Sequence, residues 1–356
     1  MSSSRPRVLV VDDSAFMRRL ASQIIEGSGE FTVVGTARNG IDALKQIHAL
    51  DPDLVTLDVD MPELDGLNTL GYIMSEVPRP VVMLSAGTAG DGEDAALRAL
   101  ELGAVDFVRK PSGPISLDLR DVTDQILGAL RAALQTNVAA LRMMPRYVAE
   151  KSDEASDSFE GATNAVVIAS STGGPRALTA VLPRLSRSLD AAVLVVQHMP
   201  TGFTKSLARR LDGISPVHID EAEDGEPVVH GRVYIAPGGQ HMSVCETPAG
   251  PRILLSCEPA VWGVRPAADI LFRSAAAVFG ASTVGIVLTG MGRDGADGVR
   301  AILAAGGRAV AQDRESSTIF SMPNAAIEHG GAKIIRPLTS ISDEIANLVE
   351  ALPHVR

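Results

Sequence analysis

The chain has 356 residues, enough for two domains and a linker at about 150 residues per domain. Hydrophobic residues make up 46% and charged residues 21%, which is typical of a globular protein, and the net charge of −11 argues against a nucleic-acid partner because such binding needs cationic contacts to phosphate. Two cysteines exclude a disulfide scaffold, and we expect a cytoplasmic protein because no apolar run has the length of a leader or a membrane span.

The first part of the chain alternates between short apolar runs and amphipathic helical patterns. Apolar runs of strand length lie at 7–13, 32–37, 54–60, 80–86 and 106–110. Helical patterns follow them, at 14–26, 41–50, 67–76, 92–102 and about 116–134. Strands that are buried on both faces and separated by helices indicate a parallel sheet covered on both sides. We therefore predict an α/β domain over residues 1–125.

Acidic and polar residues stand where these predicted strands end. Asp12 and Asp13 end the first strand, Asp58 the third, Ser85 the fourth and Lys110 the fifth. Because the carboxyl ends of parallel strands meet at one edge of a sheet, we expect the three carboxylates to lie close together. Carboxylates that close repel one another unless a cation is present, and oxygen ligands with water suit Mg²⁺. The alternative is that each aspartate caps the helix after its strand.

Taken together, these segments resemble the response-regulator receiver family. The matching segments are VVDDS (10–14), LDVDMPELDG (57–66), LSA (84–86) and KP (110–111), within about residues 5–125. The resemblance implies a flavodoxin-like (βα)5 receiver domain that is phosphorylated on Asp58. It further implies Asp12, Asp13 and Asp58 as Mg²⁺ ligands, Ser85 and Lys110 as phosphate contacts, and Phe107 as the aromatic switch residue.

A polar, serine-rich and acidic segment at 150–161 lacks any periodicity, so we place a linker over residues 126–162 and a second domain over residues 163–356. In this domain, apolar strand runs lie at 165–171, 191–197, 282–289 and 307–312. The runs at 241–246 and 252–258 flank TPAGP and predict a β-hairpin. Cys245 and Cys257 would face each other across it, as buried free thiols or, alternatively, as a disulfide. These patterns predict a doubly wound, mainly parallel α/β domain with a β-hairpin.

Three reactive side chains follow predicted strands of the second domain. Ser171 precedes Thr-Gly-Gly-Pro and a helix, His198 follows the strand at 191–197, and Asp294 follows the strand at 282–289. The strand-end rule brings them to one crevice, and a serine nucleophile, a histidine base and an orienting aspartate together perform acyl transfer. Taken singly, the serine could cap the helix, the histidine could be a loop residue and the aspartate a turn residue.

A dinucleotide site competes with this interpretation. Gly290, Gly292 and Gly295 form a G-x-G-x-x-G pattern after a strand, and Asp313 follows at about the distance expected for a ribose contact. Against it, Asp294 lies inside the loop and Asp297 just beyond it, where their charges would repel a pyrophosphate.

Four segments resemble the chemotaxis protein-glutamate methylesterase family, over about residues 163–350. They are IASSTGGP (168–175), VVQHMPTGFTKSLARRL (195–211), IAPGGQHM (235–242) and VLTGMGRDGADG (287–298). The resemblance implies Ser171 as nucleophile, His198 as base and Asp294 as orienting residue, with Met291 as an oxyanion contact through its backbone N–H, and Thr172 and His241 as further residues of the substrate site. The usual G-A-S-T-G-G reads A-S-S-T-G-G here, so Ser170 is a second candidate nucleophile, although the register favours Ser171.

The two resemblances together imply a phosphorylation-activated hydrolase. It would demethylate glutamate methyl esters on methyl-accepting chemoreceptors, and deamidate their glutamines, with a chemotaxis histidine kinase as phosphodonor. Mg²⁺ would serve the receiver and no cofactor the ester hydrolysis. We expect a monomer that meets the membrane only through its receptors and binds no nucleic acid. The alternatives are a non-catalytic receptor-binding regulator and a dinucleotide-binding output domain.

Overall fold

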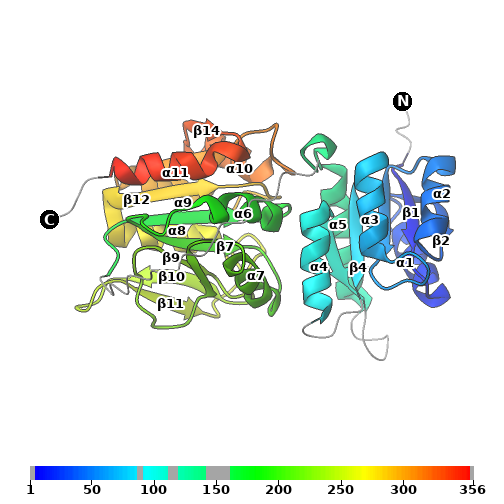
Figure 1. Ribbon diagram of the computed structural model, residues 1–356, viewed down its shortest axis with the longest axis horizontal. Helices are drawn as coiled ribbons and strands as arrows, with labels where there is room; N and C mark the ends of the chain where they lie inside the picture. Colours follow the sequence, from blue (N-terminus) through cyan, green and yellow to red (C-terminus); the bar gives the residue numbers. More distant parts are fainter. Residues whose placement is uncertain (1–4, 86–90, 111–118, 142–160, 353–356) are drawn as a thin grey trace. The chain divides into compact units, whose positions relative to one another are not determined.

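A computed structural model describes residues 5–85, 91–110, 119–141 and 161–352 of the chain (Figure 1). The chain divides into two compact units, residues 1–143 and 144–356. Within the described ranges, no helix has both the length and the apolar character needed to cross a membrane. The acidic segment expected at 150–161 lies, apart from its last residue, outside the described residues.

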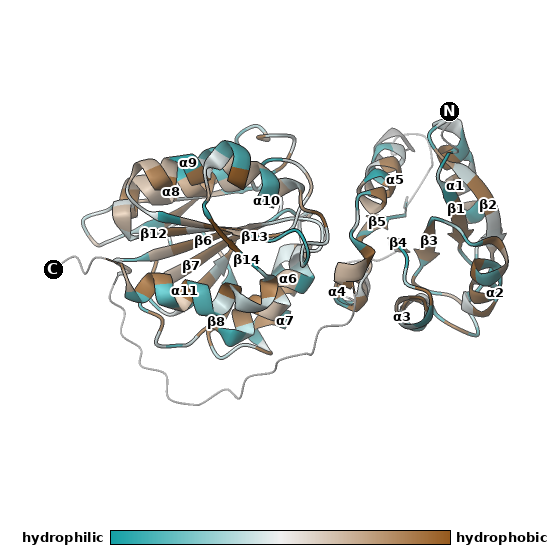
Figure 2. Ribbon diagram, turned by 90° about the horizontal axis from the view of Figure 1, so that it is seen from above, coloured by the Kyte–Doolittle hydropathy of each residue, from teal (hydrophilic) through white to brown (hydrophobic). Residues whose placement is uncertain are grey.

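The first unit is a parallel sheet of order β2-β1-β3-β4-β5. Its strands are β1 (Arg7–Val11), β2 (Thr32–Ala37), β3 (Leu54–Asp58), β4 (Val81–Ser85) and β5 (Asp106–Arg109). Its helices are α1 (Ala15–Gly27), α2 (Gly40–Leu50), α3 (Gly66–Glu76), α4 (Asp91–Leu102) and α5 (Leu119–Leu134). Helices α1 and α5 cover one face of the sheet, and α2, α3 and α4 cover the other (Figure 2). The predicted α/β domain, a parallel sheet covered by helices on both faces, is confirmed.

The aspartates at the strand ends do not cap the first three helices of this unit. Ser14, Asn39 and Asp65 accept backbone N–H groups at the starts of α1, α2 and α3. Asp12, Asp13 and Asp58 therefore cap none of these three helices.

The first unit extends beyond the boundary expected at residue 125. Helix α5 crosses that position, and its apolar face continues through the buried side chains of Ile126, Leu130 and Ala133. Leu141, at the end of a 3₁₀ turn (Val138–Leu141), is also buried. Because a helix face that covers a sheet cannot be cut without exposing its apolar side chains, the expected linker start at 126 is corrected to a position after residue 141.

The second unit is built on a seven-stranded parallel sheet of order β14-β13-β12-β6-β7-β9-β8. The strands are β6 (Ala165–Ser170), β7 (Ala192–Gln197), β8 (His218–Glu221), β9 (Arg232–Ile235), β12 (Thr283–Val287), β13 (Arg308–Gln312) and β14 (Ile334–Arg336). The helices are α6 (Gly174–Val181), α7 (Phe203–Asp212), α8 (Ala268–Phe279), α9 (Ala296–Ala304), α10 (Ser321–Ala325) and α11 (Ile341–Glu350). Helices α8 and α9 cover one face, and α6, α7 and α11 the other (Figure 2).

Strands β8, β9 and β14 are not among the strands expected from the sequence. They are only three or four residues long, and β8 and β14 lie at the two edges of the sheet, where the pattern of buried apolar residues is weak.

The predicted hairpin is confirmed as the antiparallel pair β10 (His241–Cys245) and β11 (Arg252–Ser256). The expected placement of its cysteines is wrong. Cys245 pairs with Arg252, whereas Cys257 follows Ser256 at the other end of the hairpin, so the two thiols do not face each other. Both are free, with Cys245 half-buried and Cys257 exposed. In an antiparallel pair a residue beside the turn faces the other strand's residue beside the turn, not one at the far end.

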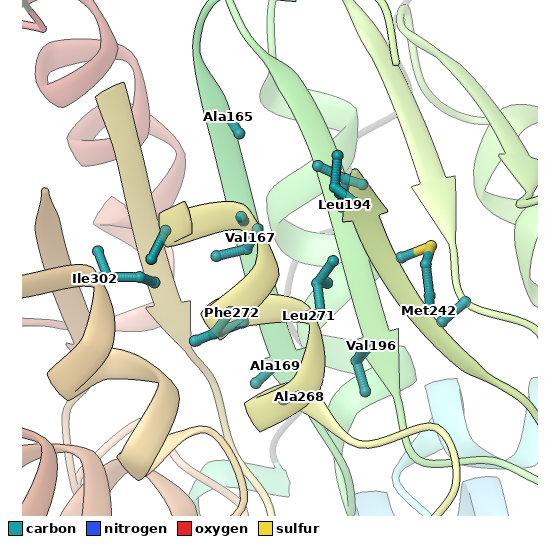
Figure 3. Close-up of a cluster of buried hydrophobic side chains, with 14 of the residues drawn as sticks. Ala165, Val167, Ala169, Leu194, Val196, Met242, Ala268, Leu271, Phe272 and Ile302 are labelled. Carbon is teal, nitrogen blue, oxygen red and sulfur yellow. The ribbon is translucent and has the colours of Figure 1, made fainter. Parts of the chain in front are cut away.

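The core of the second unit lies between the sheet and helices α8 and α9 (Figure 3). Alternate residues of β6 point into it, and small side chains let the helices approach closely. A Cβ on Gly298 of α9 would come within 2.4 Å of the Phe272 side chain of α8, so glycine is needed there. The labelled core side chains are Ala165, Val167, Ala169, Leu194, Val196, Met242, Ala268, Leu271, Phe272 and Ile302.

Candidate active site

The first unit carries an acidic cluster at the carboxyl ends of β1 and β3. Asp12, Asp13 and Asp58 each offer a carboxylate oxygen within 4.8 Å of the others, with Asp12 and Asp58 buried and Asp13 exposed. The Nζ atom of Lys110 lies 2.7 Å from a carboxylate oxygen of both Asp12 and Asp58. The structure therefore brings together the three acids and the lysine expected from the sequence.

The electrostatics of this cluster favour a further cation. Burial raises the pKa of Asp58 to about 6, while Lys110 acts in the opposite direction and the neighbouring aspartates add to the rise. Three carboxylates face one ammonium group, so the set has an excess of negative charge and consists of the hard oxygen donors that Mg²⁺ prefers. The residues present fit that ion.

The remaining receiver residues lie on the adjacent strands. Ser85 is the buried last residue of β4, and its carbonyl oxygen accepts the backbone N–H of Lys110 at 2.8 Å. Phe107 is half-buried on β5, beside Met83 of β4. The sheet thus places Ser85 next to Lys110 of the acid cluster. Phe107 lies three residues before Lys110 in the chain.

In the second unit, the order of the strands reverses between β6 and β12. From β6 the sheet continues to β7 in one direction, and from β12 to β13 and β14 in the other. Such a switch point leaves a crevice at the carboxyl ends of the strands. Ser171 follows β6, His198 follows β7 and Asp294 lies in the loop after β12, so all three stand at this crevice.

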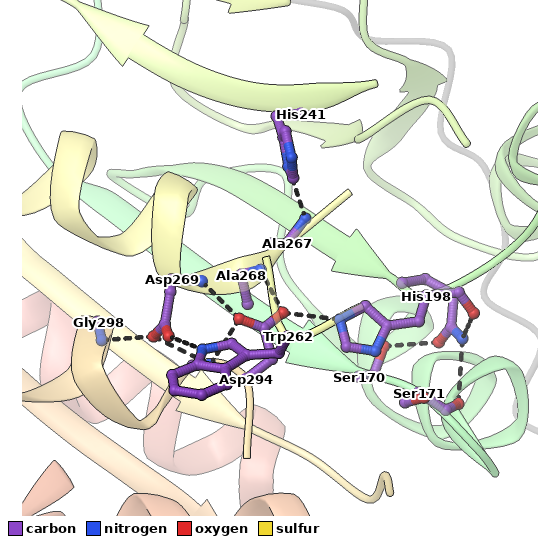
Figure 4. A network of polar contacts seen from close by, with 12 residues as sticks. Ser170, Ser171, His198, His241, Trp262, Ala267, Ala268, Asp269, Asp294 and Gly298 are labelled. Atoms are coloured by element: carbon purple, nitrogen blue, oxygen red, sulfur yellow. Dashed lines mark hydrogen bonds and ion pairs between the residues drawn. The ribbon is translucent and has the colours of Figure 1, made fainter. Parts of the chain in front are cut away.

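His198 and Asp294 form a tight pair (Figure 4). The Nε2 atom of His198 lies 2.7 Å from Oδ2 of Asp294, and both side chains are almost fully buried. Since an ionised carboxylate only accepts hydrogen bonds, the ring donates its Nε2–H and keeps Nδ1 as an acceptor. The backbone N–H groups of Ala268, Asp269 and Gly295 also donate to Asp294, at 2.6, 3.0 and 3.0 Å. Asp294 is therefore anchored by three backbone donors in a position that orients the imidazole.

Of the two adjacent serines, Ser171 is the one with an available hydroxyl group. Ser170 is fully buried, and its hydroxyl donates to Oε1 of Gln197 at 2.7 Å. Ser171 is partly exposed, and its hydroxyl makes no hydrogen bond within the described part of the chain. Neither serine side chain caps α6, whose N-cap is Gly173. This geometry favours Ser171 over Ser170 and removes the capping alternative.

Gln197 joins the backbone of the serine to that of the histidine. Its Nε2 donates to the carbonyl oxygens of Ser171 and His198, at 3.0 and 2.9 Å. A Cβ on Gly174 would lie 1.9 Å from its Oε1, so the second glycine of Thr-Gly-Gly is needed for this close approach. Gln197 was not among the residues expected at the site, although its position directly before His198 was a usable signal.

Met291 and Thr172 belong to the segments that lie beside Ser171. A Cβ on Gly290, the residue before Met291, would meet the Cβ of Ser171 at 2.8 Å. The backbone N–H of Met291 donates to no acceptor among the described residues, so it is available to a ligand. Thr172 is partly exposed, and its carbonyl oxygen accepts the Thr289 hydroxyl at 3.0 Å.

The substrate role expected for His241 is not supported. The side chain is 1% exposed, its Nδ1 accepts the N–H of Ala267 at 3.1 Å, and its Nε2 donates to the carbonyl oxygen of Pro259, also at 3.1 Å. Both ring nitrogens are thus used by the chain itself, and His241 instead positions the segment that leads into α8.

The dinucleotide interpretation is excluded by the groups that already occupy the start of α9. The backbone N–H groups of Gly295 and Gly298 donate to the carboxylates of Asp269 and Asp294, so none of these is left for a pyrophosphate. Asp313, the expected ribose contact, instead accepts hydrogen bonds from the N–H and hydroxyl of Ser316.

Comparisons with known proteins match each unit to a known family. Residues 8–120 match the model of the response regulator receiver domain, and residues 166–345 match that of the CheB methylesterase. The chain is 44% identical to a protein-glutamate methylesterase/protein-glutamine glutaminase of Pyrococcus abyssi, over 99% of this chain and 96% of the relative. It is 46% identical to the protein of that name in Geobacillus kaustophilus, over 96% and 98%. The crystal structure of the Thermotoga maritima CheB methylesterase catalytic domain matches 52% of this chain and 98% of its own, at 42% identity and a TM-score of 0.51.

Proposed function

The chain belongs to the CheB methylesterase family, and on that premise we propose that it hydrolyses glutamate methyl esters on chemoreceptors and deamidates their glutamines under the control of its receiver. One observation carries the chemistry. Ser171, His198 and Asp294 stand at the carboxyl ends of neighbouring parallel strands, with His198 and Asp294 in contact at 2.7 Å. This is the arrangement that acyl transfer through a serine requires.

The reaction begins when the Ser171 hydroxyl attacks the ester carbonyl. The ring nitrogen of His198 that does not face Asp294 takes the hydroxyl proton, and Asp294 stabilises the imidazolium that forms. The backbone N–H of Met291 stabilises the negative oxygen, an effect worth about 3–4 kcal/mol per donor in related sites. The imidazolium returns its proton to the departing methoxide, and methanol leaves. Water then attacks the acyl-serine by the same route, and glutamate and the free serine are restored.

The receiver supplies the control. Asp58 accepts a phosphoryl group from a chemotaxis histidine kinase, and Mg²⁺ held by Asp12, Asp13 and Asp58 would neutralise charge on that group. The ammonium group of Lys110, which now lies 2.7 Å from Asp58, and the hydroxyl of Ser85 then contact the added phosphoryl oxygens. Phe107 repositions as the conformation of β4 and β5 changes. The unphosphorylated receiver suppresses the esterase.

The partners follow from this chemistry. The substrates are methyl-accepting chemoreceptors, and the enzyme acts in the cytoplasm as a monomer that meets the membrane only through them. No cofactor takes part in ester hydrolysis, because the serine, the imidazole and the backbone donors supply the nucleophile, the base and the oxyanion site.

The proposal is tested by methanol release from methylated receptor membranes. We expect the Ser171→Ala variant to be at least about a thousandfold slower than the wild type. The matched variant Ser170→Ala should stay within about threefold, because the hydroxyl that it removes donates to Gln197 and not to the reacting groups. Near-normal release by Ser171→Ala would refute the assignment of the nucleophile. No release by the wild type would instead favour the receptor-binding regulator.

A further inference from the structure

A second buried carboxylate lies behind Asp294, and the serine mechanism does not use it. Asp269, in the first turn of α8, is 0% exposed. Its Oδ1 accepts the backbone N–H groups of Gly295 and Gly298 at 3.1 and 2.6 Å, and its Oδ2 accepts the indole N–H of Trp262 at 2.8 Å (Figure 4). All three partners are donors, so the site fits the ionised form of the carboxylate.

The two carboxylates cap each other's helices. Asp294 stands just before α9 and accepts the N–H groups of Ala268 and Asp269 at the start of α8. Asp269 stands at the start of α8 and accepts the N–H groups of Gly295 and Gly298 at the start of α9. Neither helix has a side-chain cap of the ordinary local kind. Each helix start therefore depends on the carboxylate that belongs to the other.

The outer side of Asp269 is closed by Trp262. This residue lies in a tight turn with a φ of 55°, a conformation that non-glycine residues rarely adopt. Its indole ring is held between the hydrogen bond to Asp269 and the guanidinium group of Arg293, which lies 4.4 Å from the ring centroid. The strained turn is thus kept in place by contacts that lead to Asp269.

We propose that Asp269 is a positioning residue for the reaction at Ser171: it fixes the start of α9, and with it the Asp294 carboxylate that orients His198. The inference rests on the esterase function proposed above. Without the carboxylate of Asp269, the N–H of Gly298 loses its acceptor and the N–H of Gly295 keeps only Asp294. The segment that follows Asp294 then loses both of its hydrogen bonds to Asp269. Asp269 touches neither His198 nor the reacting atoms in this geometry.

Asp269 also adds negative charge behind the catalytic pair. Burial and, less strongly, the neighbouring Asp294 carboxylate hold the pKa of Asp269 above its usual range, while the indole and amide donors oppose this. The charged groups that face it are Asp294, the guanidinium of Arg273 at 4.0 Å, and beyond Arg273 the carboxylate of Asp297, at 3.5 Å from that guanidinium. A charge at Asp269 favours protonation of the imidazole in the transition state.

The test uses the full-length protein and its Asp269→Asn variant. We expect kcat for methanol release to fall about tenfold to a hundredfold, with KM within about twofold. The rising limb of kcat/KM against pH should move to lower pH, because a protonated imidazole loses a nearby negative charge. The rate at which a fluorophosphonate labels Ser171, with loss of fluoride, should fall in parallel. That probe needs no receptor.

Two further variants separate positioning from general loss of structure. Asp297→Asn removes the same charge from the first turn of α9, but its carboxylate contacts Arg273, Arg293 and Arg300 rather than backbone N–H groups. Its kcat and labelling rate should therefore stay close to those of the wild type. Trp262→Phe removes one donor from Asp269 and should lower kcat and the labelling rate in the same direction as Asp269→Asn, to a smaller extent. It covers the case in which Asp269→Asn does not fold.

Each outcome decides the inference. Wild-type kcat and labelling in a folded Asp269→Asn protein would overturn it, and so would equal losses in Asp269→Asn and Asp297→Asn with no shift of the pH limb. A wild type that is labelled but releases no methanol would refute the proposed substrate only, since the labelling rates of the variants still test Asp269. A wild type that does neither would overturn both proposals.

Discussion

Replacement of Gln197 by methionine should lower both the stability and the turnover of the second unit. The Nε2 of Gln197 donates to the carbonyl oxygens of Ser171 and His198, and its Oε1 accepts the Ser170 hydroxyl, in three hydrogen bonds of 2.7 to 3.0 Å. Methionine has a similar length but none of these polar groups. The Ser170 hydroxyl would then stay buried without its acceptor, and the carbonyl oxygen of His198 would lose this donor. The carbonyl oxygen of Ser171 would keep the N–H of Gly174.

The magnitude follows from these contacts. Three hydrogen bonds at about 0.5–1.5 kcal/mol net each predict a loss of about 2–4 kcal/mol in the free energy of unfolding. Because two of the bonds hold the backbone of the proposed nucleophile and base, their relative position should loosen. A misplacement of about 1 Å costs about a hundredfold in rate, so we expect kcat to fall about tenfold to a hundredfold with little change in KM.

The assay combines urea unfolding with the kinetics of methanol release. Ser170→Ala is the matched control, because it removes only the hydrogen bond to Oε1 and should cost about 1 kcal/mol with kcat within about threefold of the wild type. A Gln197→Met protein with the unfolding midpoint and kcat of the wild type would show that the amide does not hold Ser171 and His198 in place.

Two further predictions concern control and pH. Removal of residues 1–150 should raise the basal rate of methanol release, whereas a lower rate would mean that the phosphorylated receiver activates the esterase directly. Because burial holds the pKa of Asp269 above its usual range, the native state keeps this proton to higher pH than the unfolded chain, so the free energy of unfolding should fall as pH rises from about 4 through the raised pKa. Unfolding curves against pH should lose this component in Asp269→Asn, and an unchanged pH dependence in that variant would contradict the assignment.

The ends of the strands could be predicted from the sequence more accurately than the domain boundary and the tertiary contacts around the strands. Within the first unit Asp58 could be placed with Asp12 and Asp13, and within the second His198 could be placed with Asp294. In each sheet the parallel strands bring their carboxyl ends to one edge, whatever the loops do. The domain boundary at residue 125 was wrong because the apolar face of α5 continues to Ala133, and a helix pattern alone does not say which sheet it covers.

The supporting residues of the site could not be read from local patterns. Asp269 looks like an ordinary acidic residue in the first turn of a helix, and only the crossing of α8 and α9 gives it the N–H groups of Gly295 and Gly298. The role expected for His241 failed for the same reason: its partners, Pro259 and Ala267, are 18 and 26 residues away along the chain. Such contacts depend on tertiary packing, which periodicity does not describe.

The central claim is that phosphorylation at Asp58 controls hydrolysis at Ser171, and the most direct test is methanol release with and without a small-molecule phosphodonor plus Mg²⁺. Methylated receptor membranes would be treated with the full-length wild type and with Asp58→Asn. We predict that the donor raises the rate of the wild type and leaves the rate of Asp58→Asn unchanged. An equal rise in both proteins, or Ser171-dependent release by the wild type that ignores the donor, would contradict the claim.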